Sequence, residues 1–231
     1  ISPNKSQEIL PIIENIIQKI PRHIDIRLLY IQTLFSCLRP DDACAEIETL
    51  TKYHPSQKST SIQCLIQQQQ IFPQHPEILK LLGTLYTQTD AYTDALQAIQ
   101  ELNQSHPSFS DHCLELMQTI IRKLPTHGLA LEVIGQIYFN QENYPQAFFY
   151  FNQWLDVCDD VSHLQLDELL IPIHNNPADP SQNKASLLLA KVYKKTNQFD
   201  AAIQIINSLN QTEEATEAHL IHADILNHHH K

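Results

Sequence analysis

Glycine is scarce in this sequence, with 3 residues among 231. Phosphate loops, tight hairpins and flexible linkers depend on glycine, because it adopts positive φ at no steric cost. No apolar run reaches the roughly 18 residues that a membrane-spanning helix needs. No segment sustains the period-two alternation of a half-buried strand. We therefore expect no sheet, no glycine-rich phosphate site and no membrane insertion within this chain.

Basic charge is also scarce, since 15 Lys and Arg face 26 Asp and Glu, a formal net charge of -11. A nucleic-acid or anionic-membrane binder needs a basic surface, so neither partner is expected. The 5 cysteines are odd in number and form no CxxC pair, which favours a reducing, cytoplasmic location. The first residue is Ile1, so we expect a missing N-terminal portion and leave a periplasmic or membrane-anchored location open.

Prolines are plentiful and regularly spaced. A step of 52 residues separates Pro21, Pro73, Pro125 and Pro177. Ala43, Ala95 and Ala147 keep the same step, and Ala202 follows after 55, so the fourth unit has gained three residues. Such self-similarity is the signature of a repeat architecture. We predict one repeat domain over 1–231, with units at about 5–56, 57–108, 109–160 and 161–215 and a C-terminal helix at 215–228.

Each unit shows three segments of helical apolar periodicity, separated by prolines that stop a helix. The predicted first helices are 5–20, 58–72, 110–124 and 162–173. The second helices are 24–38, 77–89, 129–141 and 184–196, and the third helices are 41–53, 93–105, 145–157 and 200–210. The tripeptide His-Pro-Ser closes the first two units at 54–56 and 106–108.

The second and third helices of a unit resemble the tetratricopeptide repeat. The second unit carries Leu82-Gly83, Tyr86, Ala95, Ile99 and Pro107 at the spacing of that family. The third unit matches with Ile134-Gly135, Tyr138, Ala147, Phe151 and Trp154, and the first unit is degenerate. The resemblance implies an all-α, right-handed solenoid of helical hairpins, in which the small residues let paired helices approach closely.

The period departs from the family's 34 residues, because each unit here has an extra helix. Two arrangements remain open, a regular three-helix solenoid and ordinary hairpins alternating with degenerate ones.

Catalytic motifs are missing, since the sequence has no phosphate loop, HExxH motif or nucleophile elbow. His219 and His222 share a helix face, but nothing at ligand spacing completes a metal site. Three pairs of adjacent carboxylates lie at predicted helix starts, where acidic side chains cap free amides. These pairs are Asp41-Asp42, Asp159-Asp160 and Glu213-Glu214. We therefore expect no enzyme activity, no metal and no cofactor.

Aromatic residues are dense at 148–154. The repeat pattern buries Phe151 and Trp154. Phe148, Phe149 and Tyr150 cannot all point inward from the same helix, so they form either a packing surface for the extra helix or an exposed contact patch.

Partner-binding candidates lie on the second helices, which line the concave groove in the resembled family. Lys184, Lys191, Lys194 and Lys195 form a basic stripe in an acidic protein, suited to an acidic peptide or to the C-terminus of a partner protein. The other candidates are Thr84, Thr87, Gln88, Gln136, Phe139 and Asn140.

The resemblance and the absence of catalytic motifs predict a scaffold or adaptor that binds a partner protein or peptide. The alternative is the repeat region of a larger enzyme or of a membrane-anchored assembly factor, with its chemistry or anchor outside this chain. The oligomeric state stays open.

Overall fold

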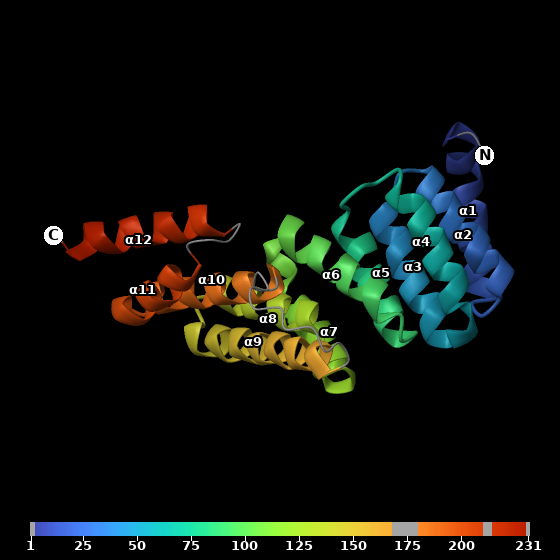
Figure 1. The fold of residues 1–231 in the computed structure, drawn as a ribbon. Coiled ribbons are helices and arrows are strands. Elements are labelled where there is room, and N and C mark those ends of the chain that lie inside the picture. Colours follow the sequence, from blue (N-terminus) through green and yellow to red (C-terminus); the bar gives the residue numbers. More distant parts are fainter. Residues whose placement is uncertain (1–2, 168–179, 210–213, 230–231) are drawn as a thin grey trace. The chain divides into compact units, whose positions relative to one another are not determined.

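The computed structural model describes residues 3–167, 180–209 and 214–229, and none of these residues lies in a strand (Figure 1). They fall into two compact units, unit 1 (Ile1–Leu116) and unit 2 (Met117–Lys231). The predicted all-α fold is confirmed. No helix in the described ranges is both long and apolar enough to cross a membrane.

Helix bounds follow the predicted repeat closely. Unit 1 contains α1 (Pro3–Lys19), α2 (Ile24–Ser36), α3 (Pro40–Tyr53), the short 3-10 helix η1 (Pro55–Gln57), α4 (Lys58–Gln69), α5 (Pro76–Gln88), α6 (Tyr92–Ser105), η2 (Pro107–Phe109) and the first half of α7 (Ser110–Lys123). Unit 2 continues with α8 (Gly128–Asn140), α9 (Tyr144–Asp167), α10 (Pro180–Lys195), α11 (Phe199–Ser208) and α12 (Ala215–His229).

One turn joins the second and third helix in all four repeats. Its central residue has positive φ, between 57° and 59°, and is never glycine. The next N–H donates to the carbonyl five residues earlier at 2.9 to 3.0 Å, as in a Schellman cap. The hydrogen bond therefore fixes the direction of each hairpin, although the turn residue varies. The four turn residues are Leu38, Asp90, Glu142 and Asn197.

Two glycines let paired helices approach closely. A Cβ on Gly83 of α5 would lie 2.9 Å from Ile99 Cγ1 of α6. A Cβ on Gly135 of α8 would lie 2.4 Å from Phe151 Cε1 of α9. Both distances are shorter than real contacts between side chains. The packing role predicted for these glycines is confirmed, and with it the tetratricopeptide-like hairpin.

The extra helix of the second repeat shares the core of unit 1. Leu65 of α4 is fully buried in one cluster with Leu34 of α2, Leu50 of α3 and Leu82 of α5. Fully burying a leucine side chain contributes about 1.5 to 3 kcal/mol. The extra helix is therefore a structural member of the repeat. In unit 2, Phe151 and Trp154 lie in one core cluster and Ile206 and Ile225 in another.

The main departure from the predicted boundaries lies in the third repeat. Helices were predicted at 145–157 and 162–173, but α9 runs unbroken from Tyr144 to Asp167. Pro55 and Pro107 begin η1 and η2 and separate the corresponding helices in the earlier repeats. Cys158-Asp159-Asp160 replaces His-Pro-Ser here, so no proline stops the helix. Asp159 and Asp160 therefore lie inside a helix, and the remainder of the predicted helix lies outside the described residues.

The acidic pair Asp41 and Asp42 does occupy the first turn of α3, as predicted. One repeat domain over the whole chain stays a prediction, since the chain divides into two compact units.

Candidate functional site

A groove of about 530 Å³ opens on the surface of unit 1. We call it the unit 1 groove. Its floor is formed by two apolar residues of α5, Leu81 and Leu85, which are almost fully buried. Its walls come from consecutive repeats, with Glu48, Thr51 and Lys52 from α3, Pro55 from η1, Lys58 from α4, and Thr84 and Gln88 from α5.

The His-Pro-Ser turn positions the two lysines of the groove. α3 ends at Tyr53, before Pro55, and η1 leads directly into α4. Lys52 is the last but one residue of α3, and Lys58 is the first residue of α4. The lysines therefore flank one tight turn at the wall of the groove.

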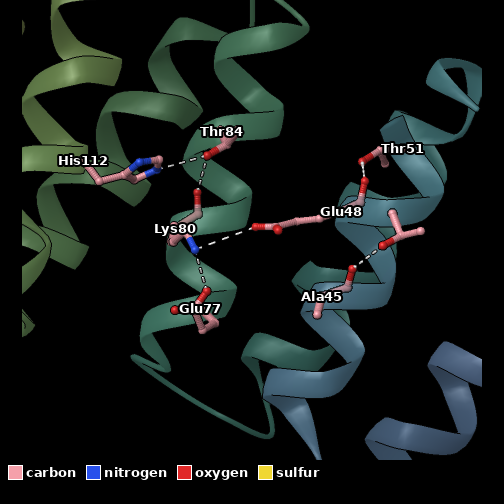
Figure 2. Close-up of polar contacts among 8 residues, drawn as sticks. Ala45, Glu48, Thr51, Glu77, Lys80, Thr84 and His112 are labelled. Atoms are coloured by element: carbon pink, nitrogen blue, oxygen red, sulfur yellow. Dashed lines mark hydrogen bonds and ion pairs between the residues drawn. The ribbon is translucent and has the colours of Figure 1, made fainter. Parts of the chain in front are cut away.

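These two lysines differ from Lys80, which lies nearby on α5. Lys80 Nζ is 2.8 Å from Glu77 Oε2 and 3.7 Å from Glu48 Oε1 (Figure 2). The hydrogen bond to Glu77 raises the pKa of Lys80, so the ammonium stays charged and is shared by the Glu77 and Glu48 carboxylates. Lys52 and Lys58 have no ion-pair partner among the described residues. The groove wall therefore carries two unpaired lysines and one carboxylate, that of Glu48, which pairs with Lys80.

A partly buried hydrogen bond joins α7 to α5 beside the groove. Thr84 Oγ1 donates to the Lys80 carbonyl at 2.8 Å, so it accepts from His112 Nε2, which lies 3.2 Å away (Figure 2). Burial lowers the pKa of His112, and the Lys80 charge lowers it further. The ring is therefore neutral near pH 7, with its proton on Nε2.

Thr84 and Gln88 are the predicted candidates that line the groove. Thr87 was also predicted, but its side chain is buried and donates to the Gly83 carbonyl at 2.7 Å. Because Thr87 is buried, whereas Thr84 is only partly buried and lines the groove, we correct the prediction for Thr87.

The predicted basic stripe of α10 is paired within unit 2. Lys184 Nζ lies 2.7 Å from Glu132 of α8, and Lys191 Nζ lies 2.7 Å from Glu217 of α12. Lys194 Nζ lies 2.6 Å from Asp224, also of α12, while Lys195 is exposed. Three of the four lysines therefore bind the protein's own carboxylates, and the stripe is not the free basic face that was expected.

The remaining candidates lie on α8. Gln136 Nε2 donates to Glu132 Oε1 at 2.9 Å, so this amide supports the carboxylate that binds Lys184. Phe139 is half-buried and packs edge-on against Tyr144, with ring centroids 5.7 Å apart. Asn140 is exposed at the end of α8.

The aromatic group of α9 is mostly packed. Phe151 and Trp154 are buried, as predicted. Phe148 contacts Tyr193 edge-on at 5.4 Å, and Tyr150 stacks on Tyr138 at 5.6 Å. Phe149 is the exposed member, at 52%. Phe148 and Tyr150 therefore pack against aromatic residues of α10 and α8, and neither ring contact involves the extra helix for which a packing surface was expected.

The buried cysteines are placed as small hydrophobic residues. Burial raises the pKa of both Cys44 and Cys113 to about 12. At neutral pH these thiols hold almost no thiolate, the form that acts as nucleophile or metal ligand. Within the described ranges, no three His, Cys, Asp or Glu side chains are grouped to hold a metal ion.

Comparison with known proteins gives structural similarity only. No protein-family model and no curated protein matches the sequence. Among solved structures, the APC/C hetero-tetramer Cut9-Hcn1 is similar, with 15% identity over 96% of this chain and 46% of that chain, and a TM-score of 0.39. Yeast Tom70 has 12% identity over 96% of this chain and 60% of its own, and a TM-score of 0.23. The chain thus spans about half the length of these proteins, and similarities this low transfer no residue role and no partner.

The sequence reasoning missed Lys52, Lys58 and His112. The signal for the two lysines was their position on either side of His-Pro-Ser, in a protein with only 15 Lys and Arg residues. His112 gave no local signal, because its contact with Thr84 depends on how two helices pack.

Proposed function

We infer that this chain is a protein-binding scaffold and that its unit 1 groove binds an extended, acidic segment of a partner protein. The observation that carries this proposal is the pair of uncompensated lysines, Lys52 and Lys58, on the groove wall. The fold favours such a role, because stacked helical hairpins present extended binding surfaces.

The chemistry of the groove supports an acidic peptide with apolar residues. Apolar side chains of the peptide fit over Leu81 and Leu85, and its carboxylates fit against the two ammonium groups. A charge-assisted hydrogen bond contributes about 1.5 to 3 kcal/mol. The exposed amide of Gln88 adds a donor and an acceptor for the peptide backbone.

Fluorescence anisotropy with a labelled twelve-residue peptide of alternating Glu and Leu tests the proposal. The full chain should bind this peptide and not the same peptide with Lys in place of Glu. The double substitution K52E/K58E should weaken binding at least about tenfold, because it removes two charge-assisted contacts. Binding should also weaken as salt is raised, because partly exposed charges are screened.

The matched control is K194E/K195E, which makes the same change in net charge on the α10 stripe. This variant should bind the acidic peptide as the unchanged protein does. Equal loss in both variants would show only a general charge effect, and loss in the stripe variant alone would move the site to α10. Either result overturns the assignment to the unit 1 groove.

A further inference from the structure

A second groove of unit 1, with a volume of about 210 Å³, is lined by α4, α5 and α6. Its floor includes Leu82 and Tyr86 of α5, whereas the unit 1 groove uses Leu81 and Leu85 of the same helix. No residue lines both grooves. We call the second one the acidic groove. Its walls consist of Ile66 and Gln69 from α4 and Asp94, Gln97, Ala98 and Glu101 from α6.

The acidic groove offers apolar surface beside its charged groups. Ile66 is 41% exposed, and the ring of Tyr86 is half-buried. Burial raises the pKa of Tyr86, and the negative charge of Asp94 raises it further, so the phenol is neutral near pH 7. The apolar stem of a Lys or Arg side chain packs well on such a surface, and an aromatic ring attracts its cationic end.

The two carboxylates of the acidic groove are not neutralised by the folded protein. Asp94 and Glu101 have no ion-pair partner among the described residues. Gln69 Nε2 donates to Glu101 Oε2 at 3.5 Å, a long and weak hydrogen bond. The only basic residues of α4, α5 and α6 are Lys58, which lines the unit 1 groove, and Lys80, which is ion-paired. The wall from α6 therefore carries two uncompensated negative charges.

The acidic pair is specific to the second repeat. Residues at the corresponding positions of the other three repeats include a single acid, Asp42, and Arg39 Nε lies 2.6 Å from its carboxylate. Packing of the repeat therefore does not require two free carboxylates at these positions. The corresponding residues are Asp42, Thr49, Gln146, Gln153, Ala201 and Ser208.

The spacing of the two carboxylates fits a peptide and not a metal ion. Asp94 and Glu101 are seven residues apart on α6, which is about 10.5 Å along the helix axis. Carboxylates so far apart cannot both lie within the roughly 2.5 Å of one metal ion that coordination requires. In an extended polyproline-type segment, residues three apart lie on the same side and about 9 Å from each other. Two basic residues at that spacing therefore match the two carboxylates.

We propose that the acidic groove binds an extended basic segment of a partner protein, in which two Lys or Arg residues lie three positions apart. The cationic ends of these side chains lie against Asp94 and Glu101, and their apolar stems lie over Ile66 and Tyr86. Charge complementarity sets the choice of partner, because an acidic segment is repelled by the same two carboxylates. The site shares no residue with the unit 1 groove and does not rest on the proposed function.

Fluorescence anisotropy of the full chain with a labelled basic peptide tests the proposal. The peptide has ten residues, with two arginines three positions apart and Ala and Leu elsewhere. We expect a dissociation constant of about 10 to 500 µM, and binding at least about tenfold weaker when Gln replaces both arginines. The double substitution D94N/E101Q should weaken binding of the arginine peptide at least about fivefold. A basic peptide that does not bind at about 1 mM protein overturns the proposal.

The matched control is D156N/E142Q, which makes the same change in net charge at two exposed acids of unit 2. This variant should bind the basic peptide as the unchanged protein does, and circular dichroism should show both variants fully helical. Equal loss in the two variants would show only a general attraction to an acidic protein and overturns the site.

The variant K52E/K58E separates the two grooves of unit 1. It should not weaken binding of the basic peptide, because neither lysine lines the acidic groove. Loss of binding in this variant would place the basic peptide in the unit 1 groove and overturn the assignment to the acidic groove.

Discussion

The two lysines on the wall of the unit 1 groove and the lysine stripe on α10 of unit 2 differ in how far carboxylates pair with them. In unit 2 the stripe on α10 is largely neutralised, since carboxylates of α8 and α12 bind Lys184, Lys191 and Lys194. In unit 1, Lys52 and Lys58 have no such partner among the described residues, although the protein as a whole is acidic. A basic cluster in a sequence is therefore a poor guide to a binding surface. A better guide to a binding surface is the charge that remains after ion pairs within the folded protein are taken into account.

The largest expected difference between the units concerns Gly83 and Gly135, the glycines at the two close helix contacts. Gly135→Ala in unit 2 places a methyl group 2.4 Å from the Phe151 ring, which is fully buried. Overpacking costs about 1 to 3 kcal/mol, against a gain in helix propensity of about 1 kcal/mol. We expect a net loss of up to about 2 kcal/mol in the free energy of unfolding.

Gly83→Ala in unit 1 places the methyl group 2.9 Å from Ile99 Cγ1, a smaller overlap than the 2.4 Å at Phe151, so gain and cost should nearly cancel. Urea unfolding measures both variants, and fluorescence of the single tryptophan, Trp154, reports on unit 2. Equal losses in the two variants would contradict the argument that the larger steric overlap costs more.

Substitutions in the hairpin turns should have the next largest effect on stability. Leu38→Gly in unit 1 relieves a positive φ of 57° on a branched residue and should stabilise unit 1 by about 1 kcal/mol. Asn197→Gly in unit 2, at φ 59°, should change stability by only a few tenths of a kcal/mol, because asparagine tolerates this conformation. Thermal unfolding followed by circular dichroism compares the two, and a destabilised Leu38→Gly would refute the argument.

The lysine–carboxylate ion pairs of unit 2 should contribute less to stability. Lys191→Gln or Lys194→Gln removes a partly exposed ion pair, worth about 0.5 kcal/mol after screening by solvent. Lys52→Gln, with no partner to lose among the described residues, should leave the stability of unit 1 unchanged. The test is urea unfolding at low and high salt. The unit 2 variants should be less stable than the unchanged protein at low salt, and this difference in the free energy of unfolding should shrink as salt rises. A salt-dependent loss in Lys52→Gln would reveal a hidden partner.

The smallest effect is a pH dependence confined to unit 1. Burial lowers the pKa of His112 in the folded state, so the unfolded protein binds that proton more tightly. Stability should therefore fall as the pH drops through about 6.5, the ordinary histidine value. His112→Gln keeps a donor for Thr84 and should show a smaller fall between about pH 7.5 and 5.5. A change of equal size in both proteins would assign the effect to other groups.

The helices were predictable because prolines recur every 52 residues and stop helices by their covalent structure. The packing role of Gly83 and Gly135 was predictable for a similar reason, since only a small residue suits a close helix crossing. The unbroken α9 was not predicted, because the repeat was extended across a unit that lacks the proline. The predicted helix boundaries thus fail where one repeat differs in sequence from the others.

The site residues were harder to predict than the helices. Glu132 lies 52 residues before Lys184, and Asp224 lies 30 residues after Lys194, so their pairing depends on tertiary packing. Thr87 was assigned to the surface from the resembled family, whereas its hydroxyl is buried in α5. Periodicity places a residue on a helix, but it does not show which groups from other helices lie opposite.

The unbroken α9 also bears on how a protein of this kind evolves. In the first two repeats the third helix stops at His-Pro-Ser, which separates one module from the next. In the third repeat Cys158-Asp159-Asp160 stands in place of His-Pro-Ser, and one helix of 24 residues runs through these positions. Gain or loss of a proline at this position can thus decide whether two modules are separated by a short turn or joined by one continuous helix.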